Sequence, residues 1–281
     1  MKRRDSKPID APLRGGFTLI ELIVVVLIIG MLVALILPAL TNVGTAARLT
    51  EVRTEMTQLE SALAAFKAEY NTYPPSSLSL DPANPRTKSI LRSIWPKIKF
   101  DNSTLEVLDY SGTLDGASCL VFFLAGRDQN GFSKNPKYPF LATGKNRVPP
   151  FFVFDNARLE DNELASSSTV TFKEFLSPFP GQNKPYLYFS AYNGKGYKRD
   201  DNSDHMNRPY YQEKSSSGVL SKPYNPSSYQ LITPGADNKH GKGGLYDPQA
   251  SDPVEANSDS ARAAEWDNIT NFASQPELVP Q

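Results

Sequence analysis

The chain has 281 residues, and its 30 Lys and Arg balance its 30 Asp and Glu, so the formal net charge is zero. Nucleic-acid binders usually show a basic patch or a high pI, so no nucleic-acid partner is expected. A single cysteine, Cys119, excludes an intramolecular disulfide and a cysteine metal cluster. With only His205 and His240, a histidine-rich zinc enzyme is not expected either. We therefore expect a folded chain of one or two domains without an obvious metal-dependent chemistry.

The N-terminal block is a short basic leader followed by a long apolar run. From Leu19 to Leu37 the only charged residue is Glu21, and the apolar stretch continues to Leu40. As a helix these residues would extend about 33 Å, which is enough for the hydrocarbon core of a bilayer. Basic residues flanking a membrane segment remain in the cytoplasm. We therefore expect residues 17–40 to form a transmembrane and assembly helix with a cytoplasmic N-terminus.

Three interpretations of this block compete: a secretory signal peptide, a plain single-pass anchor, and a prepilin signal. The apolar run is long for a signal peptide, and it contains an acid. The leader ends in a glycine and is followed without a gap by the residues Gly16-Phe17-Thr18-Leu19-Ile20-Glu21, with Pro38 further along. In this pattern the block closely resembles the family of type IV pilins and type II secretion pseudopilins.

The resemblance implies a processing and assembly pathway. A membrane prepilin peptidase would remove residues 1–16 by cutting between Gly16 and Phe17, and Phe17 would be N-methylated. Glu21 would then meet the amine of Phe17 on a neighbouring subunit. Opposite charges attract strongly in a low-dielectric environment, and each is costly alone, so one subunit is not expected to satisfy Glu21. Pro38 would kink the helix, because proline removes a backbone hydrogen bond.

After this apolar run the sequence changes to an amphipathic helix over residues 41–75. Apolar residues recur at alternating spacings of three and four, which predicts one buried helical stripe: Leu49, Val52, Met56, Leu59, Leu63, Phe66 and Tyr70. A Tyr-Pro-Pro turn ends the helix. The stripe is expected to pack on a sheet of the same subunit, although a free coiled coil is the alternative.

Residues 76–281 are expected to form a periplasmic head with long loops. Residues 87–95 could form a short helix, and Asp115 and Gly126 suit the caps of a second helix containing Leu120–Leu124. Runs rich in aromatic or β-branched residues predict strands at 151–154, 186–192 and 229–233. The expected fold is α+β and type IV pilin-like, with a long N-terminal helix packed on a small antiparallel sheet.

Three head segments extend the resemblance, namely 177–189, 229–237 and 267–272, which are similar to segments of the major pseudopilins. Residues 76–176 have no such counterpart, so the head is enlarged. In the family the corresponding loop binds calcium, which implies Asp237 and Asp267 as ligands, and Asp247 joins them by proximity in sequence. Calcium takes six to eight oxygens from flexible acidic loops. The alternative is that these acids are simply solvated, so calcium is a possible structural ion and no cofactor is required.

The chain carries no complete enzyme motif. The glycines around Lys242 do not match the spacing of a phosphate-binding loop. Cys119 is expected in the core, and both histidines are expected to be solvated in loops. The chain is therefore not expected to be an enzyme.

The expected function is that of a structural subunit of an inner-membrane-anchored pseudopilus, assembling through its N-terminal hydrophobic helix in type II protein secretion. Its expected partners are the prepilin peptidase, other copies of itself, related pilins and the inner-membrane assembly platform. Two alternatives remain. One is a type IV pilin or minor pilin for adhesion, motility or DNA uptake, and the other is a membrane-tethered binding domain or enzyme with a pilin-type anchor.

Overall fold

The computed structural model describes residues 16–101, 112–141, 144–162, 171–191, 194, 196–206, 208–274 and 277–278, without the side chains of residues 36–43, 45 and 127. The chain divides into two units, Met1–Ala47 and Arg48–Gln281, and each is described by itself. All of the expected leader except Gly16 lies outside the described residues, as does the side chain of Pro38.

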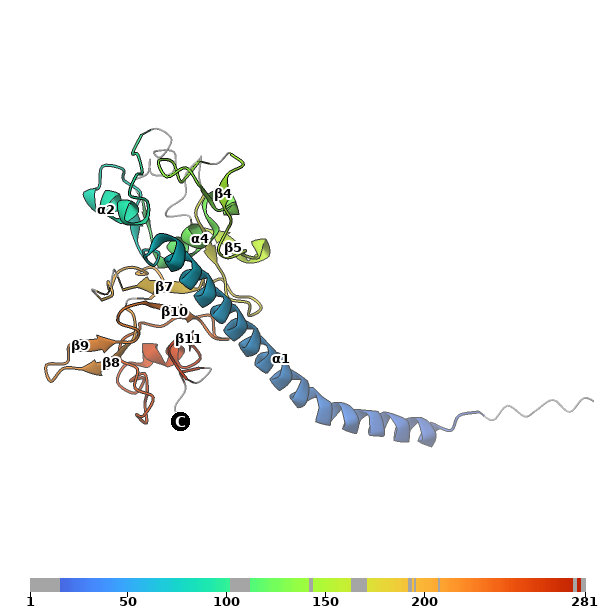
Figure 1. Ribbon diagram of the computed structural model, residues 1–281. Coiled ribbons are helices and arrows are strands. Elements are labelled where there is room, and N and C mark those ends of the chain that lie inside the picture. Colours follow the sequence, from blue (N-terminus) through green and yellow to red (C-terminus); the bar gives the residue numbers. More distant parts are fainter. Residues whose placement is uncertain are drawn as a thin grey trace, which may run out of the picture. The chain divides into compact units, whose positions relative to one another are not determined.

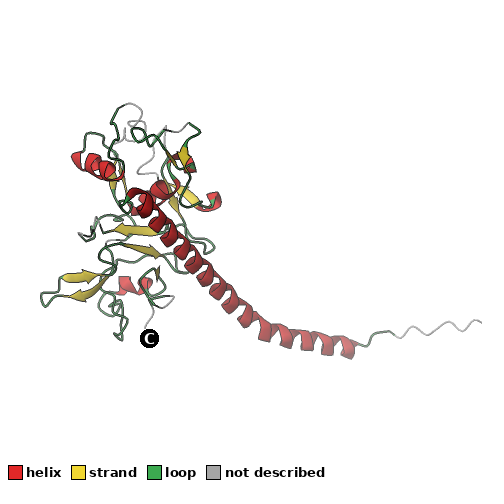
Figure 2. Ribbon diagram, viewed as in Figure 1, coloured by secondary structure: helices red, strands yellow, loops and turns green. Residues whose placement is uncertain are grey.

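The described helices are α1 (Leu19–Tyr70), α2 (Pro85–Ile94) and α4 (Gly116–Ala125), with short 3₁₀ turns at Arg127–Gln129, Asn156–Arg158 and Ser260–Glu265. Short strands joined by long loops make up the rest (Figure 2). These strands are β1 (Leu78–Ser79), β2 (Thr113–Leu114), β3 (Phe132–Ser133), β4 (Arg147–Val148), β5 (Leu159–Asp161), β6 (Lys173–Phe175), β7 (Leu187–Ser190), β8 (Tyr211–Lys214), β9 (Leu220–Pro223), β10 (Tyr229–Thr233) and β11 (Ile269–Thr270).

The central sheet has the order β11-β10-β7, and both strand pairs are antiparallel. Leu231 of β10 faces Tyr188 of β7, and both side chains are fully buried. Four two-stranded ladders surround it: β1-β2, β3-β4, β5-β6 and β8-β9. The chain is therefore α+β with small antiparallel sheets, as the sequence predicted. Strands β7 and β10 lie within the predicted segments 186–192 and 229–233.

The amphipathic half of α1 packs into the head, as its stripe predicted. Val52, Leu59, Leu63 and Phe66 are fully buried in the main hydrophobic core. This part of the helix runs beside β7 and β10 (Figure 1). The helix ends at Tyr70, where Asn71 adopts a left-handed conformation with φ 58°. Burial against the chain's own sheet confirms the prediction of intramolecular packing over that of a free coiled coil.

Helix α4 forms the centre of the head because all ten of its residues are buried. Its caps are the predicted ones: the Asp115 side chain accepts a hydrogen bond from the backbone of Ser118, and Gly126 ends the helix with φ 76°. Gly116 is required at the first position, since a Cβ there would lie 1.9 Å from the carbonyl oxygen of Tyr188. The apolar run at 120–124 is thus part of a buried helix, as its caps predicted.

A charged network joins α1 to the head. The guanidinium of Arg158 donates to both carboxylate oxygens of Glu55, at 2.7 and 2.8 Å, and also donates to the carbonyl of Leu176. The hydroxyl of Tyr186 donates to Glu55 at 2.6 Å. The two charged side chains are mostly buried. Because both carboxylate oxygens are occupied, the network ties α1 to the turn at Asn156–Arg158 and to the residue before β7.

The strand predicted at 151–154 is wrong. Pro149 and Pro150 precede it, and the N–H of Phe151 donates to the carbonyl of Leu124 at the end of α4, at 2.8 Å. The aromatic rings of this segment pack in the core, where Phe151 lies 5.3 Å from Phe66 between ring centroids. A hydrogen bond to a helix end thus replaces the strand ladder that the aromatic residues suggested.

Candidate functional site

The first turn of α1 is closed by a reciprocal capping arrangement. Glu21 Oε2 accepts from the backbone N–H of Thr18 at 2.8 Å and from its hydroxyl at 2.7 Å, while the N–H of Glu21 donates back to Thr18 Oγ1 at 3.3 Å. This is the capping box, which satisfies backbone donors that have no partner inside the helix. Glu21 Oε2 thus accepts two hydrogen bonds within its own chain, and the pairing of its charge by a neighbouring subunit stays a prediction. Among the described residues, its charge forms no ion pair.

Gly16 and Phe17 lie just before the helix, in exposed non-helical backbone. A Cβ on Gly16 would meet no atom within 4 Å. The fold therefore does not require a glycine at this position, and the predicted cleavage between Gly16 and Phe17, with methylation of Phe17, stays a prediction.

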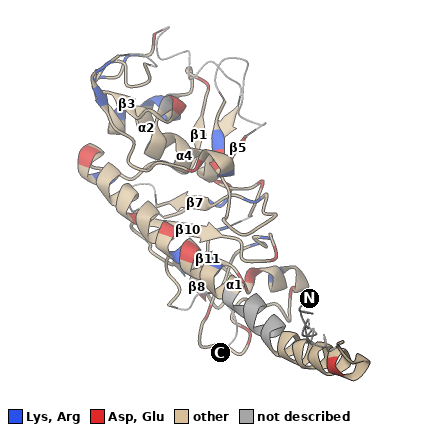
Figure 3. Cartoon of the chain, turned by 90° about the vertical axis from the view of Figure 1, so that its right-hand side faces the viewer, with Lys and Arg blue, Asp and Glu red and all other residues tan. Residues whose placement is uncertain are grey.

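The N-terminal half of α1 presents an apolar surface with nothing packed on it in the described chain. Fifteen large apolar side chains are between 47 and 81 % exposed, namely Phe17, Leu19, Ile20, Leu22, Ile23, Val24, Val25, Val26, Leu27, Ile28, Ile29, Met31, Leu32, Val33 and Leu35. No Lys, Arg, Asp or Glu occurs between Leu22 and Leu35 (Figure 3). Monomeric soluble proteins rarely expose contiguous apolar patches of this kind, which mark interaction sites.

Two further predictions concern the N-terminal half of α1: that it spans a membrane and that Pro38 kinks it. In the described part of the chain, no helix is sufficiently long and apolar to span a membrane. The backbone of α1 is helical through Pro38, and the kink predicted at this residue stays a prediction.

The acidic loops predicted for calcium come together only in part. Asp267 Oδ2 accepts from the backbone N–H of Asp237 at 2.9 Å, and Gly235 packs so closely that a Cβ there would lie 2.1 Å from the carbonyl oxygen of Asp267. Burial, together with the nearby charge of Asp237, raises the pKa of Asp267 above its usual value. The carboxylate of Asp247 instead accepts from the N–H of Gln249. The described residues form no three-carboxylate group that includes Asp247.

The glycine-rich segment around Lys242 encloses an acid of its own chain. The fully buried Glu265 accepts from the backbone N–H groups of Lys242 and Gly243, at 3.0 and 3.1 Å. Arg262 donates to both of its carboxylate oxygens, at 3.0 and 2.9 Å. Successive backbone N–H groups form an anion-binding concavity. Here that concavity holds Glu265, which agrees with the rejection of a phosphate-binding loop.

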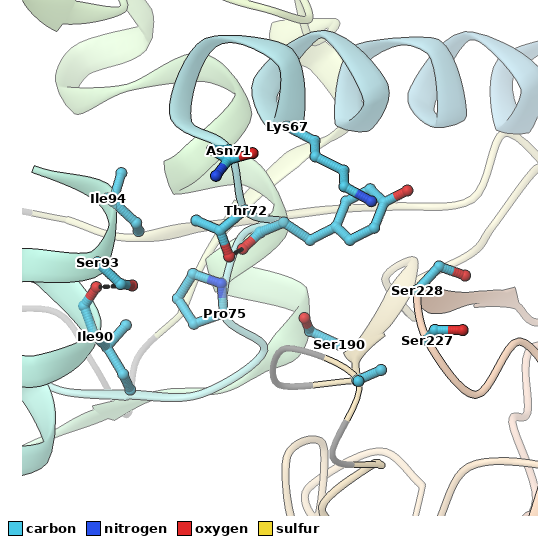
Figure 4. Close-up of a pocket in the computed structure, with 13 residues that line it drawn as sticks. Lys67, Asn71, Thr72, Pro75, Ile90, Ser93, Ile94, Ser190, Ser227 and Ser228 are labelled. Atoms are coloured by element: carbon cyan, nitrogen blue, oxygen red, sulfur yellow. Dashed lines mark hydrogen bonds between the residues drawn. The ribbon is translucent and has the colours of Figure 1, made fainter.

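A cavity of about 280 Å³ lies where the end of α1 meets α2, β7 and the turn before β10 (Figure 4). Its polar groups include the side chains of Ser190, Ser227 and Ser228. The Lys67 ammonium lies 4.3 Å from the centroid of the Tyr73 ring, in a cation–π contact. The described lining contains no His, Cys, Asp or Glu.

The head holds a cluster of three titratable side chains that no sequence pattern predicted, which we call the Asp–Glu–His cluster: Asp115, Glu174 and His205. His205 Nε2 lies 3.3 Å from Glu174 Oε2 and 3.6 Å from Asp115 Oδ2. The three side chains are only 12–14 % exposed. They come from the cap of α4, from β6 and from the turn at 201–205, so no local spacing revealed them.

Burial shifts the protonation of this cluster. Burial, followed by the charge of Glu174, raises the pKa of Asp115 to about 6. Burial alone would lower the pKa of His205, but its hydrogen bond with Glu174 and the charges of both acids raise it above its usual value. Each carboxylate favours the imidazolium, as opposite charges do at short distance.

The prediction of solvated histidines is wrong for both residues. His240 is 2 % exposed, and its Nε2 lies 2.9 Å from the carbonyl oxygen of Pro185. Its ring centroid is 6.0 Å from that of His205. Burial, followed by the neighbouring His205, lowers the pKa of His240 to about 3, so its ring is neutral at physiological pH. By contrast Cys119 is fully buried in the core, as predicted.

These features define a class of protein. It is an α+β protein whose head packs on the second half of a long helix. The first half of that helix exposes an apolar surface, and Glu21 caps its first turn. Three curated relatives match, each named type II secretion system core protein G. The protein from Aeromonas hydrophila is 35 % identical over 68 residues, which is 24 % of this chain and 48 % of the relative. That from Pseudomonas aeruginosa is 34 % identical over 68 residues, with the same coverage.

The third relative, from Pectobacterium carotovorum subsp. carotovorum, is 37 % identical over 65 residues, which is 23 % of this chain and 42 % of the relative. The chain thus spans about half the length of the curated relatives it matches. No family model matches, and no solved structure matches. The comparisons support a pseudopilin-like family for this chain, in agreement with the resemblance read from residues 16–21.

Proposed function

We propose that this protein is a structural subunit of a pseudopilus in type II protein secretion, and that it assembles through the N-terminal half of α1. The observation that carries the proposal is the continuous apolar surface of residues 17–35, which the described chain leaves uncovered. Identical helices packed side by side would bury this surface, and apolar burial contributes about 25 cal/mol per Å². The similarity to core protein G favours secretion over a type IV pilus.

Glu21 has a defined role in this assembly. The capping box supplies two hydrogen bonds to its Oε2, but its charge has no ion-pair partner among the described residues. Covering an ionised carboxylate with apolar surface is costly unless a cation pairs with it. Cleavage after Gly16 would create such a cation, the Phe17 amine, on every subunit. We therefore propose that Glu21 pairs with that amine on a neighbouring copy and sets the register of the helices.

Three variants separate capping from charge pairing. Glu21→Gln keeps an oxygen that can accept from Thr18 but removes the charge, so we expect it to abolish filaments seen by electron microscopy. Glu21→Ala should do the same. Thr18→Ala weakens the cap by about 1 kcal/mol but leaves the charge, so it should still assemble. Filaments of normal abundance from Glu21→Gln would refute the charge-pairing role.

Cleavage of the leader can be tested by substituting Gly16. Gly16→Ala introduces no clash, because no atom lies within 4 Å of the added Cβ. Any loss of processing therefore reports recognition by the prepilin peptidase and not misfolding. Mass spectrometry of wild-type protein should give a methylated Phe17 at the N-terminus, and of Gly16→Ala an intact leader. Wild-type filaments that retain residues 1–16 would overturn the proposal.

We place the unassembled subunit in the inner membrane, with its N-terminus cytoplasmic and its head periplasmic, beside the assembly platform. This placement is supported by the basic leader and by the apolar run that follows it in the sequence. It predicts that protease added to spheroplasts digests residues 48–281 and that the protein resists carbonate extraction. Release of the protein by carbonate would contradict the placement.

Secretion and pilus functions differ in what a deletion strain loses. For a pseudopilin, the culture supernatant of that strain should lack secreted proteins, and the wild-type gene but not its Glu21→Gln version should restore them. Unchanged secretion with loss of surface pili, twitching or DNA uptake would instead favour the type IV pilin.

A further inference from the structure

Three side chains from separate elements direct one donor atom each toward the same point in the head. His205 Nε2 faces Oδ2 of Asp115 and Oε2 of Glu174, and one possible ligand atom from each of the three residues lies within 4.8 Å of the others. From this convergence we infer that the Asp–Glu–His cluster is a binding site for a divalent transition-metal ion of the zinc type.

The distances agree with coordination by such an ion. A tetrahedral zinc ion with bonds of about 2.0–2.1 Å holds its ligand atoms roughly 3.3–3.4 Å apart. His205 Nε2 lies 3.3 Å from the Glu174 donor and 3.6 Å from the Asp115 donor. Three protein ligands leave a fourth position for water, and the side chains are 12–14 % exposed, so solvent can reach the site.

Neighbouring groups hold the carboxylates in the orientation that ligation needs. Asp115 uses its other oxygen, Oδ1, to accept from the backbone N–H of Ser118 at 2.9 Å. Glu174 uses Oε1 to accept from the amide of Asn162 at 2.9 Å. Metal sites commonly have such outer partners, which orient the ligands. Here they leave Oδ2 and Oε2 to face His205.

The charge of the cluster and the kinds of donor atom in it favour a divalent transition-metal ion over calcium. Two carboxylates face one imidazole, so even a protonated His205 leaves the cluster with an excess negative charge. A divalent ion with a neutral imidazole and two carboxylates sums to zero. Imidazole suits zinc and its neighbours among the transition metals, whereas calcium prefers oxygen alone. The acids predicted for calcium, Asp237 and Asp267, lie elsewhere in the head and belong to a different site.

A direct test uses the full-length chain in detergent, stripped of metal and titrated with Co²⁺ and Zn²⁺. Wild type should bind one equivalent of Co²⁺ with the intense visible absorption of a tetrahedral complex, and Zn²⁺ should displace it while Ca²⁺ should not. No bound ion, or binding without the tetrahedral spectrum, would refute the site as described. Because these readings come from the wild-type protein, they stand even if a variant fails to fold.

Variants assign the ligands. His205→Gln and Glu174→Gln should each weaken Zn²⁺ binding by at least 100-fold in calorimetry, and Asn162→Ala should weaken it by about 10- to 100-fold. Glu160→Gln is the matched control, because Glu160 faces Glu174 across β5 and β6 but is exposed and outside the cluster. Unchanged Zn²⁺ affinity in a folded His205→Gln would show that the three side chains form only an ion pair and would overturn the proposal.

Discussion

The buried ring of His240 makes a prediction about the pH dependence of stability. Its ordinary pKa is 6.5, and burial lowers it to about 3. Protonation would place a charge on a ring that is 2 % exposed, and Nδ1 has no hydrogen-bond partner among the described residues. The charged groups that act on it, His205 and Lys184, both oppose a further positive charge.

The sign follows from the protons bound in each state. Below pH 6.5 the unfolded chain takes up a proton at His240, whereas the folded chain keeps the ring neutral until about pH 3. The stability that the neutral His240 ring contributes is therefore fully present above pH 6.5 and is lost as the pH falls. One proton corresponds to about 1.4 kcal/mol per pH unit, which gives a loss of free energy of unfolding of roughly 2–3 kcal/mol between pH 6 and pH 4.

The assay is urea unfolding of the full-length chain in detergent at several pH values, followed by tryptophan fluorescence, with a chelator present to exclude metal binding. The control is His240→Gln, whose amide can still donate to the carbonyl oxygen of Pro185 but does not titrate. The carboxylates contribute equally to the pH dependence of both proteins. The difference between their free energies of unfolding therefore reports the titration of the His240 ring. If His240→Gln loses as much free energy of unfolding between pH 6 and pH 4 as wild type, the reasoning is refuted.

Three further predictions concern the head. Gly116→Ala should lower the free energy of unfolding by about 3 kcal/mol, because its Cβ would clash with the backbone of Tyr188, and a normal Tm would contradict that. Glu55→Gln should cost about 2 kcal/mol in urea unfolding by leaving Arg158 without its mostly buried partner, and a loss below 0.5 kcal/mol would show that the network is dispensable. If calcium binds at the acidic loop, a calcium-selective chelator should lower the Tm of wild type but not of Asp267→Asn, and equal behaviour of the two proteins would remove this site.

The features that the sequence predicted well are those set by neighbours in the chain. The stripe from Val52 to Phe66 follows from helical periodicity, and the caps of α4 follow from the side chains of Asp115 and Gly126. The exposed apolar surface of residues 17–35 follows from composition alone. In each case the determining interactions span at most a few residues, so their spacing is visible in one dimension.

The tertiary structure decided everything that depends on contacts between distant segments. It placed Phe151 at the end of α4, although its segment was predicted as a strand. It also buried His240, which was predicted to be solvated in a loop. It also brought Glu174 and His205 to Asp115 at the cap of α4, although they follow Asp115 by 59 and 90 residues in the sequence. Such convergence has no local signal, because the fold joins loops whose separation along the chain carries no periodicity. The N-terminal half of α1 thus owes its apolar character to its composition, whereas the Asp–Glu–His cluster exists only because the head is folded.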